Sequence, residues 1–181
     1  MPHYKTLGTI PHKRHTVFRQ DNGELYHEQL FGTIGFDGMS SLLYHVHPPT
    51  KVDDILGSRD VSPKVSVDKN MQMRAFKGFD VPVVDDLIDS RVPVLTNTDV
   101  TLSLSRPKNL SQEYFYKNVD ADEVIFIHEG KGTLKTQLGN IEFSYGDYLV
   151  VPRGMIYQMS FEDSNNRHFI IESRYPIYTP K

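Results

Sequence analysis

Histidines and carboxylates are the side chains of this chain that could hold a metal, because the sequence contains no cysteine. His45 and His47 lie two residues apart in a β-like segment, so both imidazoles would point from one face of a strand. Iron or zinc needs a third strong ligand, and none stands at a recognisable spacing. A metal enzyme built on His45 and His47 therefore stays open beside a structural role for both at the strand end before Pro48.

The remaining histidines favour structural roles. The segment from His12 to His15 is basic enough to meet a carboxylate or phosphate, but a short charged cluster is more typical of a solvated arm or an intersubunit contact. His128 and His168 have no partner visible in the sequence. The chain also lacks a Gly-x-Ser-x-Gly elbow and a phosphate-binding glycine loop. We therefore predict no catalytic residue in it.

Two glycine-containing motifs carry more information. The first runs from Glu123 to Gly130 and continues through Gly132, and the second runs from Gly146 to Gly154 with Pro152 before its end. Glycine at these places permits the sharp turns between successive strands. The pair of motifs resembles those of the cupin family, which implies a conical antiparallel jelly-roll barrel.

The resemblance also locates the positions where metal-binding cupins carry their ligands. Their first motif has His-x-His about four residues before the glutamate, and the second has a histidine three residues after Pro-x-Gly. The upstream positions hold Lys117 and Val119, or Tyr116 and Asn118 in the alternative spacing, and the downstream position holds Tyr157. Only Glu123 remains, and a carboxylate with a phenol of ordinary pKa ~10 does not hold iron at neutral pH. We expect no metal and no cofactor in this chain.

Three polar residues of the motifs define a candidate barrel pocket. If Glu123, Arg153 and Tyr157 point inward, they form a polar site in an apolar cavity that suits a small organic acid. The alternative, which we favour, is that these groups satisfy one another inside a packed barrel.

Alternating apolar and polar residues recur along the whole chain and predict an all-β protein. The predicted strands are Arg14–Arg19, Glu24–Phe31, Ser41–His47, Met71–Phe76, Val100–Ser105, Gln112–Lys117, Glu123–Ile127, Thr133–Leu138, Ile141–Ser144, Tyr148–Val151, Ile156–Phe161 and Arg167–Ser173. Gly139-Asn140 predicts a tight hairpin turn. Val52–Leu56 and Val84–Ile88 predict at most short helical turns.

A polar, proline-containing stretch over residues 48–69 separates an N-terminal β meander from the denser β region. We expect an N-terminal arm and connecting loop over residues 1–91 and a cupin jelly-roll core over residues 92–181.

Composition excludes several classes of protein. The 181 residues carry a net charge of −3, with 38 % hydrophobic and 24 % charged residues, which is ordinary for a globular chain. Scattered lysines and arginines argue against a nucleic-acid partner. No apolar run suits a signal peptide or a membrane span, so we expect a cytoplasmic protein without membrane contact.

A narrower resemblance covers roughly residues 10–178. Gly23–Thr33, Ser41–Tyr44, Tyr114–Ile127 and Arg153–Met155 resemble the N-terminal half of homogentisate 1,2-dioxygenase. That family implies a bicupin of twice this length or more, whose Fe(II) is held by two histidines and a glutamate of the C-terminal cupin. The family reaction is the opening of the homogentisate ring by O2 in tyrosine and phenylalanine breakdown.

The resemblance implies that this chain is the N-terminal, non-metal cupin half of such an oxidoreductase, with the C-terminal half as its partner and a homo-oligomeric assembly. We expect the isolated chain to be inactive, so its status as an enzyme stays open. The alternative is a standalone single-cupin module that binds a small aromatic or organic acid.

Overall fold

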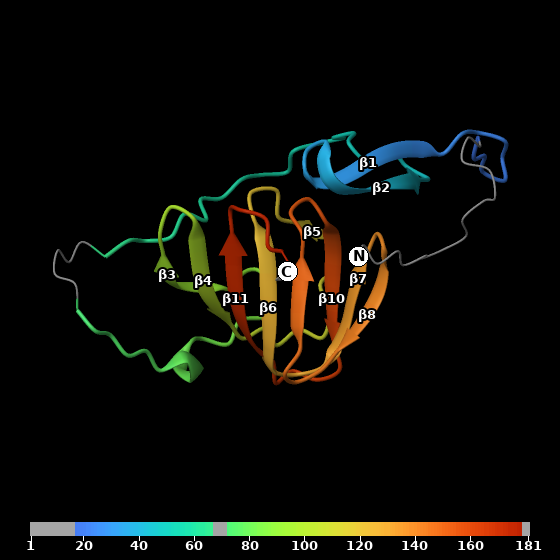
Figure 1. Cartoon of the computed structure of the whole chain (residues 1–181). Helices are drawn as coiled ribbons and strands as arrows, with labels where there is room; N and C mark the ends of the chain where they lie inside the picture. The colour runs from blue at the N-terminus through green and yellow to red at the C-terminus, as the bar shows by residue number, and fades with distance from the viewer. Residues whose placement is uncertain (1–16, 67–71, 179–181) are drawn as a thin grey trace. The chain divides into compact units, whose positions relative to one another are not determined.

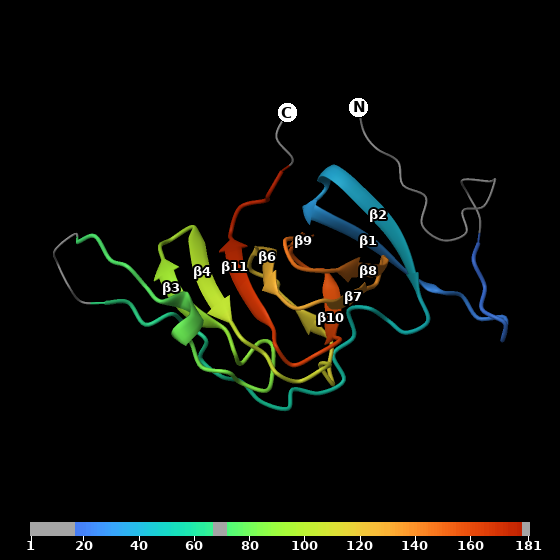
Figure 2. The ribbon, with the colours of Figure 1, turned by 90° about the horizontal axis from the view of Figure 1, so that it is seen from below.

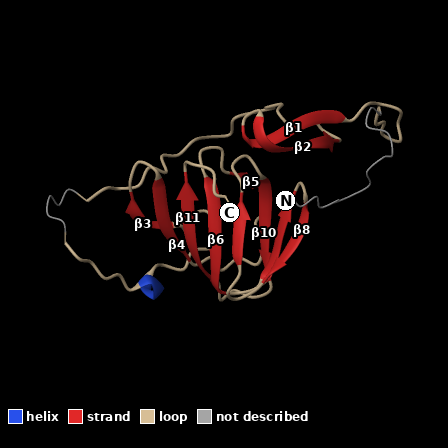
Figure 3. Cartoon of the chain, in the orientation of Figure 1, coloured by secondary structure: helices blue, strands red, loops and turns tan. Residues whose placement is uncertain are grey.

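The protein is described by a computed structural model over residues 17–66 and 72–178, and strands joined by loops dominate it (Figures 1 and 3). It divides into two compact units, residues 1–61 and 62–181. The first unit ends at Val61, and the expected division into an arm and a cupin core after Arg91 stays a prediction. In the described ranges, no helix has the length and apolar character to cross a bilayer.

The first unit contains an antiparallel hairpin of β1 (His27–Ile34) and β2 (Asp37–His45). Ile34 pairs with Asp37, so Gly35 and Phe36 form the turn. Gly35 adopts a φ of 59°, which glycine reaches without steric cost. The hairpin fixes the histidine-rich strand end, because His27 pairs with His45 across it.

The described residues of the second unit, 62–66 and 72–178, form nine strands in two antiparallel sheets. These strands are β3 (Val92–Thr96), β4 (Val100–Ser105), β5 (Tyr116–Lys117), β6 (Asp122–Glu129), β7 (Gly132–Thr136), β8 (Gly139–Phe143), β9 (Tyr148–Val151), β10 (Ile156–Phe161) and β11 (Arg167–Ser173). One sheet has the order β3-β4-β11-β6-β9, and the other has the order β5-β10-β7-β8. Figure 2 shows β3, β4, β11 and β6 side by side. A short 3-10 turn, η1 (Gly78–Asp80), precedes β3.

The core lies between the inner faces of the two sheets. Alternate residues of β6, β10 and the first half of β11 are buried there, as the period of two in a strand requires. On β10 the buried residues are Tyr157, Met159 and Phe161, and the aromatic ring of Phe161 stacks on the ring of His168 from β11 with centroids 5.4 Å apart. The protein therefore has the expected all-β jelly-roll architecture of a cupin.

Four predicted strands agree with the structure at both ends, namely β4, β9, β10 and β11. The predicted strand Gln112–Lys117 is reduced in the structure to β5. The Met159 N–H on β10 bonds to the Gln112 side-chain oxygen at 2.8 Å, so a side chain takes the place of a backbone carbonyl there. The predicted strand Met71–Phe76 was wrong, since residues 72–76 are loop.

Other predictions at the N-terminal side also need correction. Residues 14–16 of the predicted strand Arg14–Arg19 lie outside the described residues, and Arg19 forms a single bridge with Leu25. Strand β3 was not predicted. Val52–Leu56 forms no helical turn, and the turn expected at Val84–Ile88 lies over residues 87–90.

The predicted hairpin joins β7 to β8, but Gly139-Asn140 is not its turn. Thr136 pairs with Gly139, so Gln137 and Leu138 form the two-residue connection and Gly139 begins β8. The Thr136 hydroxyl stabilises this turn by accepting from the Leu138 N–H at 3.1 Å and donating to the Gly139 carbonyl at 2.8 Å. The Thr136 side chain thus stabilises the turn that Gly139-Asn140 was expected to form.

Gly132 should be the least replaceable glycine of the second unit. A Cβ atom at this position would lie 1.9 Å from the Ser160 carbonyl oxygen on β10. We expect Gly132→Ala to lower the free energy of unfolding by about 3 kcal/mol or more, because the backbones of β7 and β10 must separate. Gly57→Ala, with open space around the added methyl group, is the control in the same urea titration. Equal stability of both variants would contradict the prediction.

Candidate functional site

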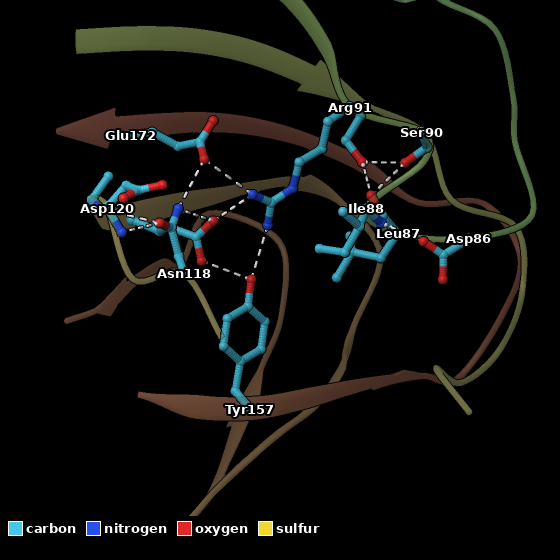
Figure 4. A network of polar contacts seen from close by, with 12 residues as sticks. Asp86, Leu87, Ile88, Ser90, Arg91, Asn118, Asp120, Tyr157 and Glu172 are labelled. Atoms are coloured by element: carbon cyan, nitrogen blue, oxygen red, sulfur yellow. Dashed lines mark hydrogen bonds and ion pairs between the residues drawn. The ribbon is translucent and has the colours of Figure 1, made fainter. Parts of the chain in front are cut away.

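A buried charged cluster joins the two sheets of the second unit. Glu123 on β6 and Tyr157 on β10 are both completely buried. Arg91, which immediately precedes β3, extends its side chain between them (Figure 4). Its side chain is only 8 % exposed, so the charge is withdrawn from water together with its partner.

The three residues form a closed ring of hydrogen bonds. Arg91 Nη1 makes a short ion pair with Glu123 Oε1, and Arg91 Nη2 donates to the Tyr157 hydroxyl at 2.9 Å. The Tyr157 hydroxyl donates in turn to Glu123 Oε2 at 2.8 Å. Both carboxylate oxygens of Glu123 are thereby paired, which is the condition under which a buried charge is tolerated.

A capped turn delivers Arg91 to this position. The Asp86 carboxylate accepts from the Ile88 N–H at 2.8 Å and the Asp89 N–H at 3.0 Å, and the Ser90 N–H donates to the Asp86 carbonyl. The turn buries Leu87 completely. The chain therefore enters β3 with Arg91 directed inward.

Ser90 fixes the same turn to the sheet. Its hydroxyl lies 2.5 Å from the Ser105 hydroxyl of β4 and donates to the Leu87 carbonyl at 2.9 Å. Both serines are buried.

Glu172 on β11 adds a second carboxylate to the cluster. Its Oε1 lies 3.6 Å from Arg91 Nη1 and accepts from Asn118 Nδ2 at 3.0 Å. Asn118 also reaches Glu123 Oε1 at 3.4 Å. The Tyr116 ring lies under the Arg91 guanidinium at 5.4 Å, a distance at which a cation is attracted by the face of the ring.

The protonation states follow from burial and from the neighbouring charges. Burial raises the pKa of Tyr157 well above its ordinary value, Arg91 opposes this rise, and Glu123 adds to it. Burial also raises the pKa of Tyr116 to about 12 and raises that of Glu172. Burial alone would lower the pKa of Arg91, but the proximity of Tyr157 and Glu123 raises it. At neutral pH, the cluster thus contains a guanidinium cation and neutral phenols.

This donor set does not fit a transition metal. The only carboxylate at the cupin glutamate position is already bonded through both oxygens, and Tyr157 stays a neutral phenol. A divalent cation bound beside Glu123 would also be repelled by the positively charged Arg91 guanidinium at close range. Throughout residues 17–66 and 72–178, no group of three or more histidine, aspartate or glutamate side chains is arranged to hold a metal.

The structure brings together two of the three predicted pocket residues. Glu123 and Tyr157 are bonded, as described above. Arg153 lies beyond β9 and donates its backbone N–H to Asp122 Oδ1 at 2.9 Å. Among the described residues, the cation paired with Glu123 is Arg91. The sequence offers no spacing signal for Arg91, because it lies 32 residues before Glu123. The inward-facing position of Glu172 on a predicted strand was the one available signal for that residue.

The His45 and His47 pair lies in the first unit. The ring of His45 bonds through Nε2 to Gln29 Oε1 at 2.8 Å, and His47 is exposed beyond the end of β2. His12 and His15 lie outside the described residues.

His168 occupies the opposite end of the inner face from Glu172. It is 2 % exposed, and neither of its ring nitrogens has a hydrogen-bond partner among the described residues. Burial lowers the pKa of His168 to about 3, and electrostatic interactions with Arg91 and His128 act in the same direction. The residue is therefore a neutral member of the core.

Comparison with known proteins identifies relatives over the whole chain. The family described as homogentisate 1,2-dioxygenase N-terminal matches residues 5–179. A protein of Saccharolobus solfataricus named "Putative dioxygenase" is 35 % identical over 181 residues, which is 100 % of this chain and 46 % of the relative. The chain thus spans about half the length of this curated relative.

Solved structures with similar folds include two cupins. A cupin-2 domain protein from Shewanella frigidimarina is 22 % identical, with a TM-score of 0.38 over 46 % of this chain and 79 % of that chain. A cupin from Bacteroides fragilis is 18 % identical, with a TM-score of 0.41 over 62 % of this chain and 92 % of that chain.

Removing the central cation should destabilise the second unit. We expect Arg91→Met to lower the free energy of unfolding by about 3–5 kcal/mol, because Glu123 is left buried without its counter-charge. Adding Glu123→Gln should restore a large part of this loss, with a coupling free energy of about 2 kcal/mol or more in a double-mutant cycle. Chemical denaturation of the four proteins measures both quantities.

Arg174→Met is the matched control, since this arginine is exposed and its backbone N–H, which bonds Asp99, is unchanged. A loss as large in Arg174→Met as in Arg91→Met, or strictly additive effects at positions 91 and 123, would contradict the assignment.

His168 should make the protein sensitive to acid. The unfolded chain takes up a proton at this residue near pH 6.5, but the folded protein does so only near pH 3. The contribution of His168 to the free energy of unfolding is therefore fully present above pH 6.5. It falls by roughly 5 kcal/mol as the pH is lowered toward 3. We expect His168→Phe to flatten the stability profile in this window, as measured by urea denaturation at several pH values. A loss of stability toward pH 3 as steep in His168→Phe as in the wild-type chain would contradict this prediction.

Proposed function

Because this chain belongs to the homogentisate 1,2-dioxygenase N-terminal family, we propose that it is a non-catalytic cupin half that supports a catalytic half elsewhere in a longer enzyme. Its own role is structural: it supplies a stable barrel against which the rest of the enzyme is held. The reaction chemistry belongs to that other half.

One observation carries the proposal, namely the position of the Arg91 guanidinium. Glu123 and Tyr157 stand at the two positions that the cupin motifs associate with metal ligands, and both are bonded to Arg91. A cation from the chain itself therefore neutralises the carboxylate. The same interaction withdraws both motif positions from any role toward Fe(II) or substrate.

The resemblance to the dioxygenases supplies the wider setting. It implies an enzyme that opens the homogentisate ring with O2 in tyrosine breakdown, in the cytoplasm, with Fe(II) held by the C-terminal cupin. The chain spans 46 % of the relative from Saccharolobus solfataricus, and the remaining length of that protein is sufficient for another cupin domain.

The charge of the cluster argues against the alternative of an organic-acid binding module. Arg91 faces two carboxylates, Glu123 and Glu172, at the ion-pair distances described above. The surroundings therefore offer no unbalanced positive charge to a carboxylate ligand.

The first test measures iron binding and turnover by the 181-residue chain. We expect no stoichiometric Fe(II) in anaerobic equilibrium dialysis and no O2 uptake when homogentisate and Fe(II) are added. An active homogentisate dioxygenase assayed in parallel shows that the conditions permit turnover. Turnover by this chain, or bound iron that disappears in Glu123→Gln, would overturn the proposal.

The second test concerns the organic-acid alternative. We expect no change in Tm when the chain is heated with a panel of small aromatic and aliphatic acids, because nothing in the cluster attracts them. A dose-dependent rise in Tm that is abolished in Arg91→Met, measured against the Tm of that variant alone, would favour the binding module instead.

A further inference from the structure

Asp122, the first residue of β6, carries a buried carboxylate that the Arg91 cluster does not use. Asp122 is 3 % exposed. Consecutive residues of a strand point to opposite faces, and Glu123 points inward, so Asp122 lies toward the outer face of the sheet. The next residues on that side of β6, Val124 and Phe126, are only partly buried. The burial of Asp122 therefore needs a cause outside the barrel core.

Two backbone segments bond to this carboxylate. The Arg153 N–H, in the turn after β9, donates to Asp122 Oδ1 at 2.9 Å. The Ile177 N–H, beyond the end of β11, donates to Asp122 Oδ2 at 2.9 Å. Each oxygen thus accepts from a different segment, and hydrogen bonds to a carboxylate are stronger than those between neutral groups.

These segments follow the two strands that flank β6. Strands β11 and β9 pair with β6 on its two sides. Ser173, the last residue of β11, pairs with Asp122, so the chain leaves β11 beside Asp122 and returns to it at Ile177. We call residues 174–178 the strap. Asp122 therefore joins the strap on one side of β6 to the turn after β9 on the other side.

Hydrogen bonds, rather than buried side chains, hold the strap. None of its residues is fully buried, and Tyr175 is 66 % exposed. The Arg174 N–H donates to the Asp99 carbonyl at 2.9 Å, and the Ser173 hydroxyl donates to the Tyr175 carbonyl at 2.8 Å. A segment with so few buried contacts can open while the rest of its domain stays folded.

The bond to Asp122 fixes the far part of the strap. The bonds of Arg174 and Ser173 lie at its base, next to the end of β11. When the strap opens, the Asp122 carboxylate gains water as a hydrogen-bond partner, so the open state does not contain a buried charge without partners. Both the closed and the open strap therefore satisfy this carboxylate.

We propose that Asp122 is a latch, which holds the strap across the start of β6 and from which the strap opens while both sheets stay folded. The consequence of the latch rests on the proposed function. In a longer enzyme, the strap lies between this barrel and the half that performs the reaction. A closed latch fixes the direction in which the chain leaves the barrel, and an open latch releases it.

The first experiment measures amide hydrogen exchange by NMR in the 181-residue chain at several low urea concentrations. We expect the Ile177 amide to exchange through an opening of lower free energy than the amides of Ile125 and Ile170 in the core strands. Its exchange should depend little on urea, because opening the strap exposes little surface. Asp122→Ala should accelerate exchange at Ile177 at least tenfold relative to the core amides.

Asp147→Ala is the matched control, since Asp147 Oδ2 accepts from the Ser144 N–H at 2.7 Å in another turn of the same unit. It should accelerate exchange at Ser144 and leave Ile177 unchanged. Asp122→Asn keeps the side-chain volume but only one acceptor oxygen, so exchange should accelerate at Arg153 or at Ile177.

Three results would overturn the latch. The first is an Ile177 amide that exchanges in the wild-type chain with the free energy and urea dependence of the core amides. The second is unchanged exchange at both Arg153 and Ile177 in Asp122→Asn. The third is equal acceleration at Ile177 in Asp122→Ala and Asp147→Ala.

The second experiment measures release of the strap by trypsin under native conditions. Cleavage after Arg174 liberates residues 175–181, which mass spectrometry quantifies. We expect release at least five times faster from Asp122→Ala than from the wild-type chain, and an unchanged rate from Asp147→Ala. Equal rates from all three proteins would contradict the latch. Neither experiment involves iron or substrate, so the latch and the proposed function can fail independently.

Discussion

A guanidinium held inside a barrel is the constraint on which the second unit depends. Removing Arg91 and Glu123 from water is costly for each, and only their direct pairing, completed by the Tyr157 hydroxyl, makes the removal tolerable. The pairing specifies geometry as well as energy. It joins the turn after Asp86 to β6 in one sheet and to β10 in the other, so the spacing of the two sheets is set by a bonded ring rather than by apolar contact alone.

The sequence predicted the barrel better than the cluster inside it. Strands β9, β10 and β11 could be bounded because alternation is a local signal, and the glycine-containing motifs set their order. Arg91 could not be found this way, since its partners are 32 and 66 residues away and an arginine before a strand ordinarily faces water. Arg153 was predicted as a pocket residue because it lies inside a motif. In the structure its backbone N–H donates a hydrogen bond to Asp122.

Strand β3 shows a different limit. Val92–Thr96 contains Pro93 and follows a polar turn, and both features weaken a strand signal. It forms nevertheless at the edge of its sheet, where the missing N–H of proline is tolerated, and its register with β4 is shifted between Pro93 and Leu95. The turn of the β7–β8 hairpin was misplaced for a comparable reason, since a threonine hydroxyl outweighed the conformational preference of glycine.

The source of the cation has a consequence for how this polypeptide matures. A barrel completed by a metal ion reaches its final state only when that ion is delivered, so its yield follows the supply in the cell. Here the positive charge is translated with the chain, one per molecule, and arrives with the turn that Asp86 caps. The charge that completes this cluster is therefore present in every newly made copy of the chain.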